Sequence, residues 1–177
     1  MEHKIIFTGP VGAGKTTAIS SISDIPVVKT EANASDEVAL RKSNTTVAMD
    51  YGILNLDENA KIHLYGTPGQ ERFSFMWDIL TVGGVGLILM LDNAREDPIK
   101  DMEFFLEAFK PFIEKNGVVI GVTRTDISPR PGLYTFHKKL YELKMNVPIF
   151  EVDARDRGDV KTLLLGLLSV LDPGLKR

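Results

Sequence analysis

The sequence predicts an α/β fold in which helices cover both faces of a mostly parallel, six-stranded β-sheet with one antiparallel strand. Short apolar runs typical of buried strands alternate with segments of helical periodicity. Two continuous apolar runs, residues 85–91 and 118–122, are typical of central parallel strands. Two strand-like segments flank the polar residues 57–60 and predict a hairpin, which requires one antiparallel pair.

The first half of the chain supplies the outer and first central elements. Residues 4–8 read as the first strand, and a glycine-rich turn leads from it into a helix over residues 15–23. Residues 24–45 are polar and weakly periodic, so we expect a mobile loop there. The hairpin strands are expected over residues 51–56 and 61–65.

The second half alternates strands with amphipathic helices. Between the two central strands, apolar residues recur at helical spacing over residues 102–113, which predicts a helix packed on the sheet. A last strand is expected over residues 149–152, and a last helix over residues 160–171. The sequence shows neither a repeat nor a linker, so we expect a single domain over residues 1–177.

Composition excludes several classes of protein. The 21 Lys and Arg against 24 Asp and Glu give a net charge of −3, which does not favour nucleic acid or an anionic membrane as a partner. No apolar run approaches the roughly 20 residues of a membrane span. The chain has no cysteine, which excludes disulfides and thiol catalysis, and its three histidines are not at metal-ligand spacing. Without a signal peptide or lipidation motif, we expect a cytoplasmic protein.

The turn after the first strand carries a phosphate-binding motif. Residues 9–16, Gly-Pro-Val-Gly-Ala-Gly-Lys-Thr, fit the pattern GxxxxGK[ST] between a strand and a helix. Glycines allow the backbone N–H groups to point at phosphate oxygens, and the helix N-terminus adds a positive dipole end. Lys15 is expected to reach the β- and γ-phosphates, and the Thr16 hydroxyl to bind Mg²⁺.

A second motif follows the second hairpin strand and makes a family resemblance specific. Residues 65–73, Tyr-Gly-Thr-Pro-Gly-Gln-Glu-Arg-Phe, resemble switch II of Ras-like small GTPases, a family of the P-loop superfamily. The resemblance implies that the Gly69 N–H binds the γ-phosphate and that Gln70 orients the attacking water. Lys15, Gly69 and Gln70 are therefore the expected catalytic residues.

Three further positions extend the resemblance along the chain. Thr46, chosen over Thr45 by register, resembles the switch I threonine that binds Mg²⁺. Residues 123–126 stand at the place of the guanine-reading NKxD motif, where Asp126 matches and Thr123 and Arg124 differ. A carboxylate at Asp126 accepts from guanine N1–H and its 2-amino group, a donor pair that adenine lacks. Ala154 resembles the alanine whose N–H contacts guanine O6.

Together these motifs imply a GTP/GDP site with Mg²⁺. The residues expected to bind the nucleotide are Gly9, Val11, Gly12, Ala13, Gly14, Lys15, Thr16, Thr17, Thr46, Gly69, Thr123, Arg124, Asp126 and Ala154. The metal ligands are expected to be Thr16 and Thr46. Within the family, the chain is most similar to the prokaryotic branch of gliding-motility polarity and conservon-type GTPases, which implies roadblock-type regulators or a GTPase-activating protein as partners.

The chain departs from the family pattern at two positions. Gly66 stands where the family has the switch II aspartate that holds Mg²⁺. Either another carboxylate replaces it, with Asp50 and Asp92 as candidates, or the metal rests on threonine, phosphate and water. Val11 is glycine in Ras itself, and a branched side chain there would crowd Gln70, so we expect slow hydrolysis. An arginine of the chain itself, Arg41 or Arg72, is a candidate for assisting catalysis.

The function expected from these residues is a GTP-binding and GTP-hydrolysing molecular switch. The nucleotide would order residues 24–46 and the stretch after Gly69, and partners would bind according to its state. Two alternatives remain: a scaffold subunit that binds GTP and barely hydrolyses it, and a P-loop phosphotransferase acting on a small molecule.

Overall fold

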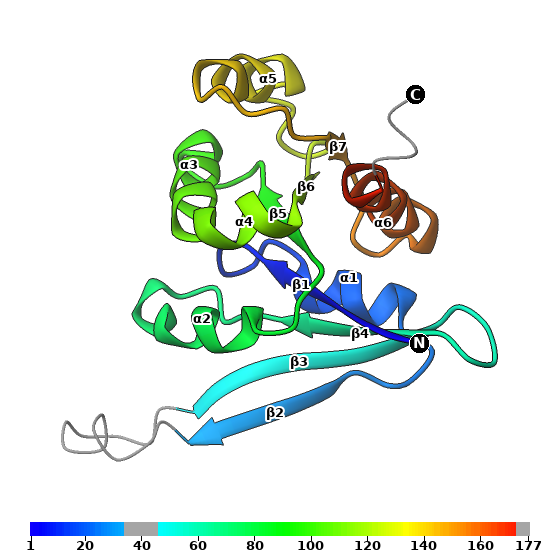
Figure 1. The fold of residues 1–177 in the computed structure, drawn as a ribbon. Coiled ribbons are helices and arrows are strands. Elements are labelled where there is room, and N and C mark those ends of the chain that lie inside the picture. The colour runs from blue at the N-terminus through cyan, green and yellow to red at the C-terminus, as the bar shows by residue number, and fades with distance from the viewer. Residues whose placement is uncertain (34–45, 173–177) are drawn as a thin grey trace.

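The computed structural model describes residues 1–33 and 46–172, and for residues 30–33 and 46–48 it describes the backbone alone. A seven-stranded sheet with the order β2-β3-β4-β1-β5-β6-β7 forms its centre (Figure 1). The strands are β1 (Glu2–Thr8), β2 (Val28–Asn33), β3 (Thr46–Asn55), β4 (Lys61–Gly66), β5 (Gly86–Asp92), β6 (Val118–Thr123) and β7 (Ile149–Glu151).

One strand of this sheet runs against the others, as the sequence predicts. β3 pairs antiparallel with both β2 and β4, whereas β4, β1, β5, β6 and β7 pair in parallel. The hairpin between β3 and β4 is confirmed, because the N–H of Leu56 donates to the carbonyl of Ala60 at 2.9 Å.

Helices cover both faces of the sheet, which confirms the predicted architecture (Figure 1). They are α1 (Lys15–Ile22), α2 (Phe75–Thr81), α3 (Pro98–Ala108), α4 (Lys110–Asn116), α5 (Leu133–Glu142) and α6 (Arg157–Leu171), with a 3₁₀ turn η1 (Glu71–Phe73). The core on one face is formed with α1 and α6, and the core on the other with α2, α3 and α5, against which α4 also packs. None of the helices in the described ranges is long and apolar enough to cross a membrane.

The sheet has seven strands instead of the expected six, because β2 forms within the segment expected to be a mobile loop. Among the described strands, β2 lies at the edge of the sheet and pairs with β3 alone. An edge strand buries little side-chain surface, so its sequence lacks the apolar signal of a central strand. The remaining residues of the expected loop, 34–45, lie outside the described residues.

The helical pattern over residues 102–113 is divided between two helices. α3 ends before Phe109, and α4 begins at Lys110 with Pro111 in its first turn. Proline lacks an N–H and its ring clashes with the carbonyl four residues earlier, so one continuous helix cannot pass through it. Apolar spacing alone does not reveal the break because both helices face the same core.

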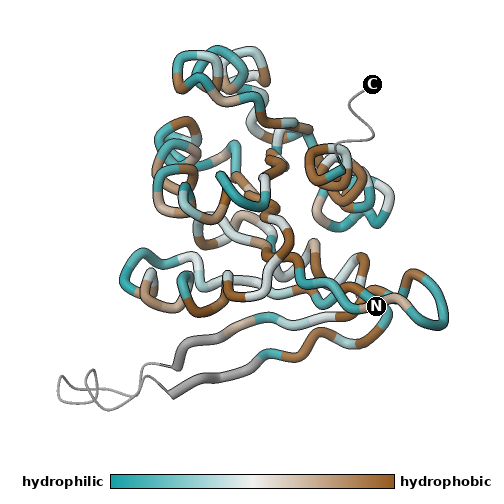
Figure 2. The backbone as a smooth tube through the Cα atoms, in the orientation of Figure 1, coloured by the Kyte–Doolittle hydropathy of each residue, from teal (hydrophilic) through white to brown (hydrophobic). Residues whose placement is uncertain are grey.

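Helix α5 is an element that the sequence pattern does not predict. Its buried residues, Phe136 and Leu140, are few, and most of its surface is polar. Figure 2 shows α5 as largely hydrophilic and α6 as largely hydrophobic. The lower apolar content of α5, and not a lack of helical spacing, distinguishes it from α6, because Leu133, Phe136 and Leu140 are three and four residues apart.

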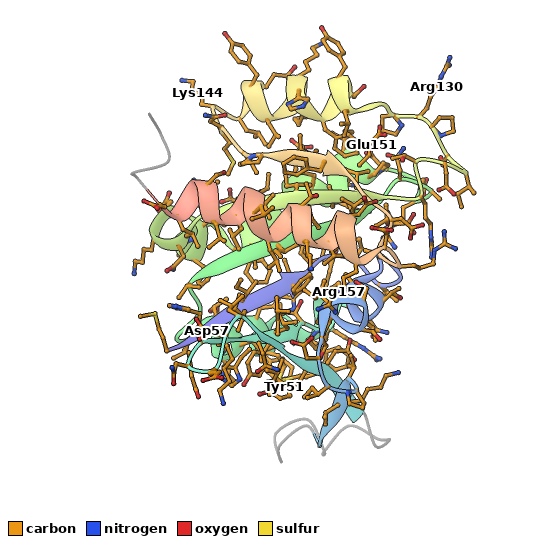
Figure 3. All side chains as sticks on the ribbon, turned by 90° about the vertical axis from the view of Figure 1, so that its right-hand side faces the viewer. Tyr51, Asp57, Arg130, Lys144, Glu151 and Arg157 are labelled. Atoms are coloured by element: carbon orange, nitrogen blue, oxygen red, sulfur yellow. The ribbon has the colours of Figure 1, made fainter. Side chains whose placement is uncertain are left out.

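The carboxyl ends of the parallel strands meet along one edge of the sheet, where ligands bind in open α/β folds. An ion pair supports the start of α6 near this edge, because Arg157 Nη2 lies 3.2 Å from Asp24 Oδ1 just after α1 (Figure 3). Arg157 also donates to the carbonyl of Ser21 at 3.3 Å. These contacts join the start of α6 to the last turn of α1 and the residues after it.

Candidate nucleotide site

The loop between β1 and α1 has a backbone conformation that favours glycine. Gly9 has φ +139° and Gly14 has φ +96°. A Cβ on Gly9 would lie 2.0 Å from the backbone oxygen of Met90 in β5, and one on Gly14 would lie 3.0 Å from Ala154 Cβ. The loop is therefore packed directly against β5 and against the loop that follows β7.

Lys15, the first residue of α1, folds back over this loop. Its Nζ donates to the carbonyl oxygens of Gly9 and Pro10, each at 2.7 Å. Burial lowers the pKa of Lys15 to about 8, while Asp50 opposes this shift and Arg95 adds to it. A buried cation beside a helix N-terminus suits a polyphosphate anion.

The segment after β4 is fixed against β1 and α2. The Thr67 N–H donates to the carbonyl of Phe7, and its hydroxyl donates to Thr8 Oγ1, each at 2.9 Å. The indole N–H of Trp77 donates to the carbonyl of Pro68 at 2.9 Å. These bonds hold the peptide that carries the switch II motif above the glycine-rich loop.

Gly69 is in contact with the glycine-rich loop. A Cβ on Gly69 would lie 2.5 Å from the backbone nitrogen of Val11 and 2.9 Å from Lys15 Nζ. Only a residue without a side chain fits this approach. The Val11 side chain is 53% exposed. The structure therefore brings the expected catalytic residues Gly69 and Lys15 together.

Gln70 is exposed and its side chain has a local partner. Arg72 Nε donates to Gln70 Oε1 at 2.6 Å, and the Arg72 guanidinium lies 4.7 Å from the centre of the Phe73 ring. The structure thus places Arg72 against the glutamine side chain. Arg41, the other candidate arginine, lies outside the described residues.

The oxygen ligands available for a divalent cation gather beside Thr16. The Thr16 hydroxyl donates to Asp50 Oδ2, and Asp50 pairs across the sheet with Gly66. Hydroxyl and carboxylate oxygens are the donors that Mg²⁺ prefers. Within residues 1–33 and 46–172, no group of three or more His, Asp or Glu side chains is arranged to hold a metal. A bound cation would therefore need phosphate or water oxygens as well.

Thr46, the second expected metal ligand, lies elsewhere on β3. It is the first residue of the strand and pairs with Asn33 of β2. Four residues separate it from Asp50, which is about 13 Å along a strand. The structure does not bring Thr46 to Asp50, and its metal role stays a prediction.

A pocket of about 610 Å³ opens beside the glycine-rich loop. Its size suits a small ligand. Expected nucleotide-binding residues that line it are Gly12, Ala13, Gly14, Thr17, Thr123, Arg124, Asp126 and Ala154. Glu151, the last residue of β7 and labelled in Figure 3, also lines this pocket.

Thr123 ties the pocket to the glycine-rich loop. Its buried hydroxyl lies 3.1 Å from the carbonyl of Ala13 and 3.0 Å from that of Leu91. A hydroxyl has one proton, so it donates to one of these oxygens at a time. The short side chain joins β5, β6 and the loop at the place where the family has asparagine.

Arg124 has a left-handed backbone, with φ +60°, and its guanidinium pairs with the buried Asp92 at 2.6 Å. Asp92 also accepts from the Ala94 N–H at 2.9 Å. Arg124 is thereby held at the wall of the pocket, while Asp126 lies exposed at its rim.

The loop after β7 completes the pocket. Arg155 Nη2 lies 2.7 Å from Asp153 Oδ2, and this pairing lowers the pKa of Asp153 to about 2. The Asp153 N–H donates to Asp159 Oδ2 at 2.8 Å. Ala154, between the paired residues, is buried against Gly14, so its backbone is held at the pocket.

Sequence reasoning assigns no contact to Thr67 or Trp77, which fix the switch II segment, and misses Arg95, which lies near enough to Lys15 to lower its pKa. The Thr67 contact joins residues 59 positions apart in the chain. No local pattern marks such a pair. For Trp77, the position shortly after the GQ motif is the one signal that the sequence offers.

The fold and the site define a P-loop nucleotide-binding protein with the fold of a small GTPase. The crystal structure of the G domain of the T. maritima FeoB iron transporter matches with a TM-score of 0.65 and 17% identity, over 97% of this chain and 100% of that chain. At this identity the match shows the fold alone.

Sequence relatives span most of the chain. The Ras-related proteins rab-11.1 of Caenorhabditis elegans and RABA1c of Arabidopsis thaliana are 21% and 23% identical over 94% of this chain, and the matches cover 75% and 73% of their own lengths. The uncharacterized protein MJ1339 of Methanocaldococcus jannaschii is 32% identical over 66% of this chain and 72% of its own length.

A family sequence model described as "Conserved hypothetical ATP binding protein" matches residues 27–145. The chain belongs to this family. The matched range includes the switch II motif and Asp126 and begins after the glycine-rich loop.

Proposed function

We propose that this protein is a GTP-binding and GTP-hydrolysing molecular switch formed by a single domain over residues 1–177. One observation carries the proposal: the Gly69 peptide lies so close to the glycine-rich loop that a Cβ on Gly69 would be 2.9 Å from Lys15 Nζ, while the same loop forms a wall of the pocket that Asp126 lines. The glycine-rich loop would then contact both the peptide that senses the γ-phosphate, at Gly69, and the pocket for the base.

Guanine is the base that this pocket favours. The Asp126 carboxylate has two acceptor oxygens for the N1–H and 2-amino donors of guanine, and adenine offers no such pair. The buried Ala154 peptide is held beside Gly14, where its N–H would serve as a donor to the guanine carbonyl. Arg124, held by Asp92, offers its stem and guanidinium as a surface for the ring.

Hydrolysis depends on positioning and charge. Lys15 and the Gly69 N–H would face the γ-phosphate, and Gln70 would orient the attacking water. In the structure Gln70 Oε1 accepts from Arg72, which leaves its second lone pair and its NH2 group for water and phosphate. The branched Val11 side chain beside this site supports slow hydrolysis without an activating protein.

Magnesium is the metal that suits these donors. Thr16 would bind it, and Thr46 would join only after a rearrangement of the first residues of β3. The ion would supply positive charge opposite the phosphates.

Partner binding would follow from the helix after switch II. α2 and the residue after it expose Phe75, Ile79 and Val82, which are 46%, 63% and 73% exposed. Phe75 and Ile79 are four residues apart and lie on one side of α2, and Val82 follows directly after the helix. We propose that regulators, of roadblock type or GTPase-activating, bind here, and that the protein is a cytoplasmic member of the prokaryotic branch.

Calorimetry on nucleotide-free protein tests the proposal. We expect GDP and a GTP analogue to bind more tightly than ADP and an ATP analogue, and Asp126→Asn to weaken GDP binding by about 10- to 100-fold through loss of a charged acceptor. Asp57→Asn, in the hairpin loop at the other end of the sheet, is the matched control (Figure 3). Equal affinity for adenine and guanine nucleotides would contradict the proposal.

The family description favours a second candidate, an ATP-binding protein. ADP binding tighter than GDP, insensitive to Asp126→Asn, would support it, and product analysis with small-molecule acceptors would then test a phosphotransferase. A protein that binds GTP without measurable hydrolysis would instead match a scaffold subunit.

A further inference from the structure

The sheet places a carboxylate beside the glycine that interrupts the family pattern. Asp50 of β3 and Gly66 of β4 are directly paired across the antiparallel ladder. A Cβ on Gly66 would lie 3.2 Å from Asp50 Cβ and 3.3 Å from Asp50 Oδ2. The Asp50 carboxylate therefore occupies the space into which a side chain at position 66 would project.

That carboxylate faces the phosphate-binding chemistry of the glycine-rich loop. Asp50 Oδ2 accepts a hydrogen bond from the hydroxyl of Thr16, the expected metal ligand. Asp50 also raises the pKa of Lys15 against the effect of burial, so its charge acts on the ammonium expected to face the phosphates. Two oxygen donors and a cation suited to phosphate thus meet at one place.

Asp92, the other candidate carboxylate, already has hydrogen-bond partners for both of its oxygens. Asp92 is 4% exposed, and its two oxygens accept from Arg124 Nη1 at 2.6 Å and from the Ala94 N–H at 2.9 Å. A carboxylate whose charge is neutralised by a guanidinium attracts a further cation weakly. Among the described residues, Asp50 is the carboxylate in contact with Thr16.

We infer that Asp50 is the magnesium-holding carboxylate of this protein, so that the acidic group has moved from β4 to the paired position on β3. This inference rests on the proposed nucleotide-binding function. Because the two positions are paired across the ladder, we expect an aspartate at position 66 to project toward Thr16 as Asp50 does, whereas aspartates at both positions would place two like charges in contact.

The test measures release of a fluorescent GDP analogue in magnesium and in EDTA. In the wild-type protein we expect magnesium to slow release. Asp50→Asn keeps the shape and an acceptor for Thr16 but removes the charge, and we expect about 10- to 100-fold weaker magnesium affinity, with release in EDTA unchanged. Asp57→Asn is the control for loss of a carboxylate.

An exchanged variant, Asp50→Gly with Gly66→Asp, makes the test specific. It restores a carboxylate from the opposite strand, so magnesium should again slow GDP release. A purely structural role of Asp50 would leave this variant as insensitive to magnesium as Asp50→Asn. In the wild-type protein, the ¹³C resonance of the Asp50 carboxyl should shift when magnesium is added to the GDP-bound form, and that of Asp92 should not.

The outcomes separate the two hypotheses. Failure of the wild-type protein to bind the GDP analogue would overturn the proposed function. Binding with a magnesium effect that survives Asp50→Asn, or binding without any magnesium effect, would overturn the role of Asp50 alone. If the variants do not fold, the wild-type carboxyl resonance decides, and an unshifted Asp50 signal contradicts the inference.

Discussion

At the scale of single residues, Lys15 shows that a side chain suited to binding an anion can lower the stability of the fold. Its side chain is 8% exposed, and its ammonium donates to the carbonyls of Gly9 and Pro10, which are neutral acceptors. Burial disfavours the charged form, which lowers the pKa of Lys15 to about 8. A phosphate would supply a counter-charge at close range, so the same feature that lowers stability favours binding.

The sign of this effect gives a prediction about pH. A folded-state pKa of about 8, below the ordinary 10.5, means that the unfolded chain binds the proton more tightly between these values. The burial of the charged Lys15 therefore lowers the free energy of unfolding in full below pH 8, and this loss decreases as the pH rises to 10.5. Relative to Lys15→Met, the wild-type free energy of unfolding should therefore rise by about 2 kcal/mol between pH 7 and pH 10.

Urea unfolding of both proteins at several pH values measures this difference. The comparison cancels other groups that titrate in the same range, since they are common to both proteins. A difference that stays constant from pH 7 to pH 10 would show that Lys15 is not buried as a cation.

At the scale of elements, the glycine-rich loop is shaped by contacts with its neighbours as well as by its own sequence. Gly9 and Gly12 both have positive φ, +139° and +79°. A Cβ on Gly9 meets the Met90 carbonyl at 2.0 Å, whereas a Cβ on Gly12 meets nothing within 4 Å. The first glycine is required by packing and conformation, and the second by conformation alone.

Alanine substitutions should separate these two causes. Gly12→Ala carries only the left-handed strain and should lower the free energy of unfolding by about 1 kcal/mol. Gly9→Ala adds a clash with the β5 backbone and should cost about 3 kcal/mol or more. Thermal unfolding monitored by circular dichroism measures both, and equal losses would mean that β5 yields to the added methyl group.

At the scale of the whole molecule, two hydrophobic cores on opposite faces of one sheet hold the site loops in place. Leu163 of α6 is fully buried in one core, and a Cβ on Gly121 of β6 would lie 2.8 Å from its Cδ1. Leu168, further along the same helix, is 46% exposed. The two leucines therefore form a matched pair on one helix.

Leu163→Ala should lower the free energy of unfolding by about 2–4 kcal/mol, because it leaves a cavity between α6 and the sheet. Leu168→Ala should cost less than about 1 kcal/mol, since its side chain stays partly in water. Equilibrium unfolding in urea checks the pair. A Leu163→Ala loss no larger than that of Leu168→Ala would place α6 away from the sheet.

The sequence by itself determined the fold class, the glycine-rich loop, the switch II motif and the position of Asp126, because these depend on local patterns and on spacing along one chain. It did not determine the seventh strand, the break at Pro111 or helix α5, whose signals are weak or masked by a shared core. The inference that Asp50, and not Asp92, holds the metal rests on the tertiary structure alone. The register between β3 and β4 places Asp50 beside Gly66 and Thr16. The pairing of β5 with β6 places Asp92 where it forms an ion pair with Arg124. Such pairings join residues distant in the chain, so no local pattern encodes them.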